Sequence, residues 1–379
     1  MIAFGTSGLP PEDGDDAAFL GGLAGRGHGA YELAFVKGFP WKEPRCRRFG
    51  ELAGERGIAL SIHAPYFAVL TLDDEEQAAR SRAALEHTLK LGRAMGARVV
   101  VAHPGFGKGR PGEDLHRIVG ENLGALERKV RHLGVALGLE VGGRSGAFGT
   151  LGDIALIARR FTFVRPVVDW AHLHAMSGGA LTSVEAFAAV FAFLRQNFPG
   201  WVLDPLHCQF SDNRFGPAGE IEHVPYGQGT LRVAPLIEAA SAAGMRLTLI
   251  SEAHDEASNE AIGGEVEAAL AEAPPPSTAA GTRPLGSGKV AFPSTLLVRA
   301  EGDGLCPSAS TPPLACPTST SPSSPTATPR GTSPSTTPLS LLCCCPTWRG
   351  GPSSSPASPT GRRESGSTRS RHLPIARPG

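Results

Sequence analysis

The sequence predicts an α/β fold: a (β/α)8 barrel of the TIM type in residues 1–272, followed by a disordered tail in 273–379. Eight short apolar runs alternate with eight stretches of helical periodicity within about 270 residues, which is the size and alternation of such a barrel. Six of the apolar runs end at a His, Asp or Glu, and a closed parallel barrel brings strand ends to one mouth. A doubly wound open sheet is the alternative, but no G-x-G-x-x-G motif follows the first run.

The elements follow in order from the apolar spacing and from local capping signals. An Asp at position 73 or 74 can cap the long helix that follows it, and the Val-rich fourth run suits a strand buried on both faces. The expected strands are residues 2–4, 30–36, 59–63, 98–103, 135–140, 164–169, 202–207 and 246–252. The expected helices are residues 13–23, 43–56, 74–95, 113–133, 151–160, 183–197, 231–243 and 259–271.

The composition changes at residue 273, where Pro, Ser, Thr, Gly and Arg begin to dominate. Residues 1–272 carry 26 Lys and Arg against 33 Asp and Glu, a net charge of −7, whereas residues 273–379 carry 10 against 3, a net charge of +7. A segment so poor in apolar periodicity cannot bury enough surface to offset its chain entropy, and we therefore expect disorder there. The same composition is typical of a shifted reading frame in a GC-rich gene.

Composition also bears on location and partners. Only two of the seven cysteines, Cys46 and Cys208, lie in residues 1–272, so no disulfide framework is indicated. No apolar run reaches the roughly 20 residues of a membrane helix, and no signal-peptide pattern opens the chain. We expect a cytoplasmic monomer. The acidic barrel argues against nucleic acid as a partner, but divalent metals at the mouth would reverse the local sign.

Eight candidate metal ligands lie at or after the ends of strands three to eight. A lone buried His is more often a hydrogen-bonded core residue, and a lone carboxylate after a strand is often a helix cap. Eight such residues at one end of a barrel favour a metal centre instead. Imidazole and carboxylate donors suit zinc, with manganese or iron as alternatives. The candidates are His63, His103, Glu140, Asp169, His172, His207, His223 and Glu252.

Five motifs carry a resemblance to a known family. In chain order they are Ser61-Ile-His-Ala-Pro-Tyr66, Val101-Ala-His-Pro-Gly105, Leu139-Glu-Val-Gly-Gly143, Val168-Asp-Trp-Ala-His172, and His223 followed by Gly227-Gln-Gly229. In this order and spacing, residues 2–272 resemble the endonuclease IV family of AP endonucleases, which belongs to the xylose-isomerase-like TIM barrels. The resemblance implies a trinuclear zinc centre that cleaves damaged double-stranded DNA 5′ to abasic sites in base excision repair.

The resemblance also implies a distribution of ligands among up to three Zn²⁺ ions. His63, His103 and Glu140 would hold the first ion. Glu140 would bridge to the second ion, which Asp169, His207 and Glu252 complete. His172 and His223 would hold the third. The family has an Asp two residues before the last His, where this chain has Ile221; Glu220, Glu222 and Asp212 are the possible substitutes.

The implied reaction is hydrolysis of a phosphodiester by a metal-bound hydroxide, with Glu140 and Glu252 as the catalytic carboxylates. The resemblance makes Tyr66 and Phe67 the residues that enter the duplex at the lesion; loop packing over the barrel mouth is their structural alternative. Two rival functions are open. One is a sugar isomerase or epimerase with a single metal held by Glu140, Asp169, His207 and Glu252. The other is a metal-bearing barrel that binds a sugar or nucleic acid without turnover.

Overall fold

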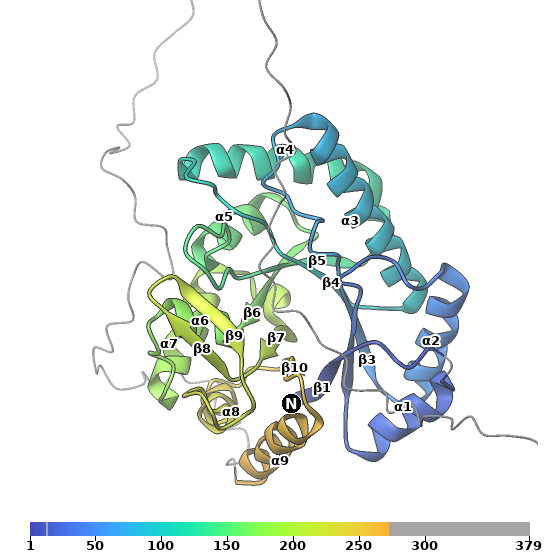
Figure 1. The fold of residues 1–379 in the computed structure, drawn as a ribbon, viewed down its shortest axis with the longest axis vertical. Helices are drawn as coiled ribbons and strands as arrows, with labels where there is room; N and C mark the ends of the chain where they lie inside the picture. The colour runs from blue at the N-terminus through green and yellow to red at the C-terminus, as the bar shows by residue number, and fades with distance from the viewer. Residues whose placement is uncertain (13, 273–379) are drawn as a thin grey trace, which may run out of the picture. The chain divides into compact units, whose positions relative to one another are not determined.

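A computed structural model of the chain describes residues 1–12 and 14–272. The predicted tail, residues 273–379, lies outside the described residues. Eight parallel strands close into a barrel in the order β1-β10-β7-β6-β5-β4-β3-β2, with the helices around its outside (Figure 1). The predicted (β/α)8 fold is therefore confirmed.

The barrel strands are short, and neighbours along the barrel are neighbours in the chain apart from an inserted hairpin. The closing pair aligns Ile2 with Leu247. The strands are β1 Ile2–Gly8, β2 Ala30–Ala34, β3 Ala59–His63, β4 Val99–Ala102, β5 Ala136–Glu140, β6 Val164–Asp169, β7 Leu206–Phe210 and β10 Leu247–Ser251.

Five of the described helices, α1, α3, α5, α6 and α7, begin at a residue whose side chain caps them. Asp74 accepts a hydrogen bond from the Gln77 backbone N–H at the start of α3, and Thr150 and Asp153 form a capping box at α5. The α-helices are α1 Asp16–Gly25, α2 Glu43–Glu55, α3 Glu75–Met95, α4 Gly112–Val130, α5 Leu151–Arg160, α6 Trp170–Met176, α7 Val184–Asn197, α8 Val233–Ala242 and α9 Glu256–Glu272. Two 3-10 turns are η1 Arg131–Leu133 and η2 Gly200–Leu203. Among the described helices, none is long and apolar enough to cross a membrane.

The core divides the barrel into an apolar base and a polar upper interior. The apolar faces of the helices pack on the outside of the strands, while Val99, Val101, Ala136 and Val167 form a separate small cluster. Higher in the barrel, the buried interior residues include charged and amide side chains, among them Glu32 and Gln209. Buried polar groups of this kind require partners, and their partners lead toward the mouth.

Two predicted strands were wrong in their bounds, and a hairpin and a short helix were not expected. The first strand was expected at residues 2–4, but β1 runs on to Gly8 because residues 5–8 pair with β2. The seventh strand was expected at residues 202–207, but Val202 and Leu203 belong to η2, and β7 runs on through His207 to Phe210. The apolar run there packs as a 3-10 turn against the core and does not enter the sheet. The loop after β7 contains an antiparallel hairpin, β8 Asn213–Gly216 and β9 Gly219–His223, which lies beside α6 (Figure 1). Neither this hairpin nor the short helix α6 was expected.

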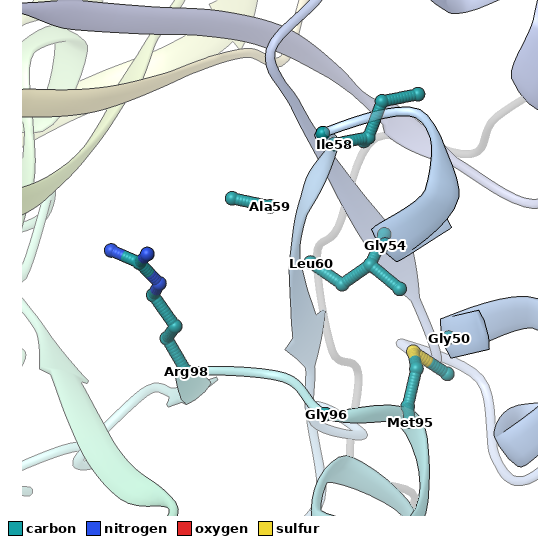
Figure 2. A pocket seen from close by; sticks show the side chains of 9 residues that line it. Gly50, Gly54, Ile58, Ala59, Leu60, Met95, Gly96 and Arg98 are labelled. Atoms are coloured by element: carbon teal, nitrogen blue, oxygen red, sulfur yellow. The ribbon is translucent and has the colours of Figure 1, made fainter. Parts of the chain in front are cut away.

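A cavity of about 310 Å³ lies beside α2 and the start of β3 (Figure 2). His63 stands at the other end of that strand. Its wall includes Gly50 and Gly54 of α2, Ala59 at the start of β3, and Arg98 just before β4. Arg98 gives this wall a positive charge. The chemistry of such barrels belongs at the carboxyl ends of the strands, and this cavity is at the amino ends.

Candidate metal centre

Glu140, the last residue of β5, is the hub of the site. Its side chain is 1% exposed. One carboxylate oxygen lies 3.2 Å from His63 Nε2. The other lies 3.6 Å from His103 Nδ1 and 3.1 Å from His172 Nδ1. Imidazoles from the ends of three different strands therefore surround one buried carboxylate.

The donor atoms fall into two groups that share Glu140. His63, His103 and Glu140 offer one atom each, all within 4.8 Å of one another, and so do Glu140, Asp169 and His172. His63 Nδ1 lies 2.9 Å from the Ala64 carbonyl oxygen. Because that oxygen can only accept, Nδ1 carries a proton there, and Nε2 is the nitrogen that faces Glu140. Fixing a ring by its second nitrogen is how proteins orient a metal-binding histidine.

Asp169 and His172 are brought together by the start of α6. Asp169 caps the helix: its Oδ1 accepts a hydrogen bond of 2.9 Å from the His172 backbone N–H. The cap places Asp169 Oδ2 3.6 Å from His172 Nδ1. Gly143 leaves room for the imidazole, because a Cβ at that position would overlap the His172 ring. The Asp-x-x-His spacing thus works through helix capping.

A third group forms around Glu220 on β9. Glu220 Oε1 lies 3.7 Å from His172 Nε2 and 3.5 Å from His223 Nε2. A β-bulge makes this possible: Arg214 pairs with Glu222 and Phe215 pairs with Glu220, so Ile221 is the extra residue. The bulge reverses the usual alternation of faces, so Glu220 lies on the side of His223 while Ile221 is 52% exposed.

The other two substitutes considered for this group are occupied elsewhere. The Asp212 carboxylate accepts backbone N–H bonds from Gly227, Gly229 and Leu231, which hold the loop after β9. Glu222 pairs with Arg214 across the hairpin. Of the three candidates, Glu220 is the residue that faces the histidines.

Strand β7 presents Gln209 to the mouth, and the structure does not bring His207 to the cluster. His207 lies two residues earlier, where its Nε2 is 2.9 Å from Glu32 Oε2 inside the barrel. Gln209 Nε2 donates to Glu252 Oε1 at 3.0 Å. Glu32 and Gln209 were missed in the sequence. A charged residue inside the apolar run of β2 was the available signal for Glu32.

The electrostatics of the cluster indicate a shortage of positive charge. Burial acts to raise the pKa of the Glu140 carboxyl, but the three imidazoles outweigh it and hold that pKa well below its usual value. Burial acts to lower the pKa of His63, but Glu140 outweighs it and raises that pKa to about 10. At Glu252, burial and then repulsion from Glu140 and Asp169 raise the pKa to about 8. A divalent cation would supply the missing charge.

The rim of the mouth carries exposed aromatic side chains. Tyr66 is 40% exposed and Phe67 is 58% exposed, and the Tyr66 ring centroid lies 5.5 Å from that of His103. Phe106, on the loop after β4, is 53% exposed and was not anticipated. An isolated bridge between Phe106 and Ala147 joins this loop to the one after β5. The Tyr66 ring thus stands beside the histidine cluster, and Phe67 and Phe106 are exposed on the loops after β3 and β4.

The fold and this cluster define an enzyme class: a (β/α)8 barrel with donor groups for divalent metal at its carboxyl-terminal mouth. The chain belongs to the xylose isomerase-like TIM barrel family, whose model matches residues 23–273. An uncharacterized protein of Methanocaldococcus jannaschii is 25% identical over 241 residues, which are 63% of this chain and 87% of that protein.

Solved structures of two functional kinds resemble this fold to a similar degree. Endonuclease IV from Thermus thermophilus matches with a TM-score of 0.55 and 18% identity, over 72% of this chain and 100% of that one. The 3-keto-D-glucoside 4-epimerase of E. coli matches with a TM-score of 0.53 and 17% identity, over 72% and 100%. D-psicose 3-epimerase from Clostridium cellulolyticum matches with a TM-score of 0.51 and 14% identity, over 71% and 97%. At these identities the likeness concerns the fold.

Proposed function

We propose that this chain is a divalent-metal-dependent phosphodiesterase that cleaves damaged DNA 5′ to abasic sites. The main support for this proposal is that three histidines surround Glu140. A ring nitrogen of each of His63, His103 and His172 lies within 3.6 Å of a Glu140 carboxylate oxygen. A single-metal sugar isomerase that uses Glu140, Asp169 and Glu252 has no evident need for His63 and His103. Their presence favours a centre with more than one metal.

The residues present fit such metals. Mixed imidazole and carboxylate donors suit zinc. His63, His103 and Glu140 would hold one ion, Glu140 and Asp169 a second, and His172, Glu220 and His223 a third. Divalent metals held there would supply a strongly polarised water and positive charge around a phosphodiester. Glu140, fixed between the two groups, sets the distance between them, and the Asp169 cap keeps its own carboxylate aimed inward.

Tyr66 and Phe67 would bind the lesion. An abasic site lacks one base, and an exposed aromatic side chain can fill the gap in the stack. Both side chains are exposed, and the Tyr66 ring lies beside that of His103. This supports the role, since a residue that served only to cover the mouth would be buried. The acidic net charge of residues 1–272 is consistent with DNA only if bound metal reverses the sign at the mouth.

The second candidate is a sugar epimerase, and Glu252 is the observation that favours it. Its carboxyl has a pKa raised to about 8, by burial first and then by Glu140 and Asp169. A carboxyl that exchanges its proton near neutrality suits proton transfer at a carbon next to a carbonyl. In that reaction, the carboxyls of Glu140, which is buried, and of Glu252, which is half-buried, would serve as base and acid.

Incision of a duplex oligonucleotide separates the two candidates. Wild-type protein loaded with Zn²⁺ or Mn²⁺ is expected to cut a duplex at a single abasic site on its 5′ side and to leave the intact duplex uncut. Glu140→Gln should abolish cutting, while Glu238→Gln, an exposed change on α8, should not. A folded, metal-loaded wild type that leaves abasic DNA intact but interconverts ketose epimers would refute the nuclease proposal and favour the epimerase.

A further inference from the structure

The interior residue that β7 places level with the metal-binding carboxylates is an amide, Gln209. In the sheet, Gln209 pairs with Asp169 on one side and with Ile250 on the other. His207, one interior position lower, pairs with Val167 and Thr248. Side chains of alternate residues face the same way, so Gln209 and His207 share the barrel interior and only Gln209 reaches the mouth.

Two carboxylates fix which way the Gln209 amide points. Its Nε2 lies 3.0 Å from Glu32 Oε1 and 3.0 Å from Glu252 Oε1. The amide nitrogen carries two N–H donors, and the Glu32 carboxylate, which also accepts a hydrogen bond from Ser61 Oγ, acts as an acceptor. Both N–H donors are therefore used, and a flipped amide would face its oxygen toward the acceptor oxygen of Glu32.

Glu32 is itself held firmly in place. Its side chain is fully buried, and it accepts a hydrogen bond of 2.7 Å from Ser61 Oγ. His207 Nε2 lies 2.9 Å from the same carboxylate oxygen, Oε2. A buried acceptor with three polar partners does not rearrange at low cost. The Glu32 anchor thus makes the orientation of the Gln209 amide a built feature of the barrel.

The oxygen of the Gln209 amide lacks a hydrogen-bond donor. Gln209 is fully buried, and its Oε1 has no hydrogen-bond partner among the residues that the structure describes. The planar amide directs Oε1 away from Glu32 and Glu252, and Asp169 on β6 is the paired neighbour on the other side of β7. Asp169 offers a second acceptor and no donor. A buried oxygen acceptor without a donor, on the residue that pairs with Asp169 in the sheet, is what a bound cation satisfies.

We propose that Gln209 Oε1 is an oxygen ligand of the divalent cation held by Glu140 and Asp169, which makes that position selective for Mn²⁺ over Zn²⁺. The inference rests on the metal centre of the proposed function. Carboxylate and carbonyl oxygens suit Mn²⁺, whereas the two imidazoles of His63 and His103 suit Zn²⁺. The centre would then hold a Zn²⁺ beside an Mn²⁺.

The test is metal binding by the full chain after chelator treatment. Zn²⁺ and Mn²⁺ are titrated separately and together, and the electron paramagnetic resonance signal of free Mn²⁺ reports how much is bound. Wild type is compared with Gln209→Met, which removes the amide oxygen, and Gln209→His, which offers an imidazole. Gln196→Met, an exposed change on α7, is the matched control. Circular dichroism checks that each variant is folded.

Gln209→Met is expected to weaken Mn²⁺ binding by about tenfold or more, the scale on which even groups that only support a ligand act. Gln209→His should let Zn²⁺ displace Mn²⁺ at lower concentration, and the control should match wild type. Unchanged Mn²⁺ affinity and unchanged competition in both folded variants would overturn the proposal, as would a wild type that binds no Mn²⁺. Because DNA incision is not measured, a failure of the nuclease proposal leaves this test intact.

Discussion

Glu252→Gln should stabilise the protein in the presence of a metal chelator, and the gain should depend on pH. The folded pKa of Glu252 is raised from 4.5 to about 8 by burial and by two neighbouring carboxylates. A raised folded pKa means that the protonated form is favoured in the fold. The contribution of Glu252 to stability is therefore fully present below pH 4.5 and is lost as the pH rises through 8.

The size of the effect follows from the shift. A difference of about 3.5 pKa units corresponds to at most about 5 kcal/mol between low pH and pH 9. Glutamine keeps an oxygen that can accept the hydrogen bond from Gln209 Nε2, which lies 3.0 Å from Glu252 Oε1, but it carries no charge. Wild type should therefore lose stability between pH 4.5 and 8, and the Glu252→Gln variant should not. Near pH 4.5 the two proteins should have nearly the same free energy of unfolding.

The assay is urea unfolding in chelator at several pH values between 5 and 9, with the free energy of unfolding taken by linear extrapolation. Glu238→Gln on α8 is the control for loss of an exposed carboxyl. The difference between Glu252→Gln and wild type should grow with pH and level off above 8. If the two proteins lose stability in parallel as the pH rises, the electrostatic reasoning about Glu252 is refuted.

Three further changes probe the site. Gly143→Ala should displace the His172 ring, because the added Cβ overlaps it, and should lower the metal content measured by mass spectrometry; normal metal content would show that the ring can shift freely. Glu220→Gln should release one metal equivalent more than Glu222→Gln, since only Glu220 faces the histidines; equal metal contents would remove Glu220 from the site. Phe67→Ala should weaken binding to abasic duplex about tenfold, measured by fluorescence anisotropy, if an aromatic side chain stacks in the lesion; equal losses on intact duplex would point to a general DNA contact.

The sequence was sufficient for the barrel because the hydrophobic pattern determines it. Apolar runs that end at His63, Glu140 and Asp169 coincide with strand ends in the structure. The last residue of each barrel strand lies at the mouth. The ends of the apolar runs therefore predicted these three site positions directly. His103, just past the end of β4, followed in the same way.

The remainder of the site depends on register, which a single sequence does not contain. The run before His207 suggested a strand that ends there, but β7 begins four residues later than expected and carries Gln209 to the mouth. A shift of this size decides which residue of β7 reaches the mouth. The same applies to Glu220, which reaches His223 only because a bulge at Ile221 reverses the alternation of faces.

Glu32 was missed for a different reason. One charged residue inside a short apolar strand indicates a buried polar group but does not show its role, which depends on partners from β3 and β7 that lie far away in the chain. Buried polar networks of this kind follow from three-dimensional neighbours and not from periodicity.

The most direct test of a multinuclear centre built on Glu140 is the number of divalent metal ions bound per chain, counted by native mass spectrometry. Wild type is expected to bind more than one ion, and Glu140→Gln to lose at least one of them because its carboxylate serves two donor groups. A wild type that binds a single ion, with the same count in Glu140→Gln, would contradict the central claim.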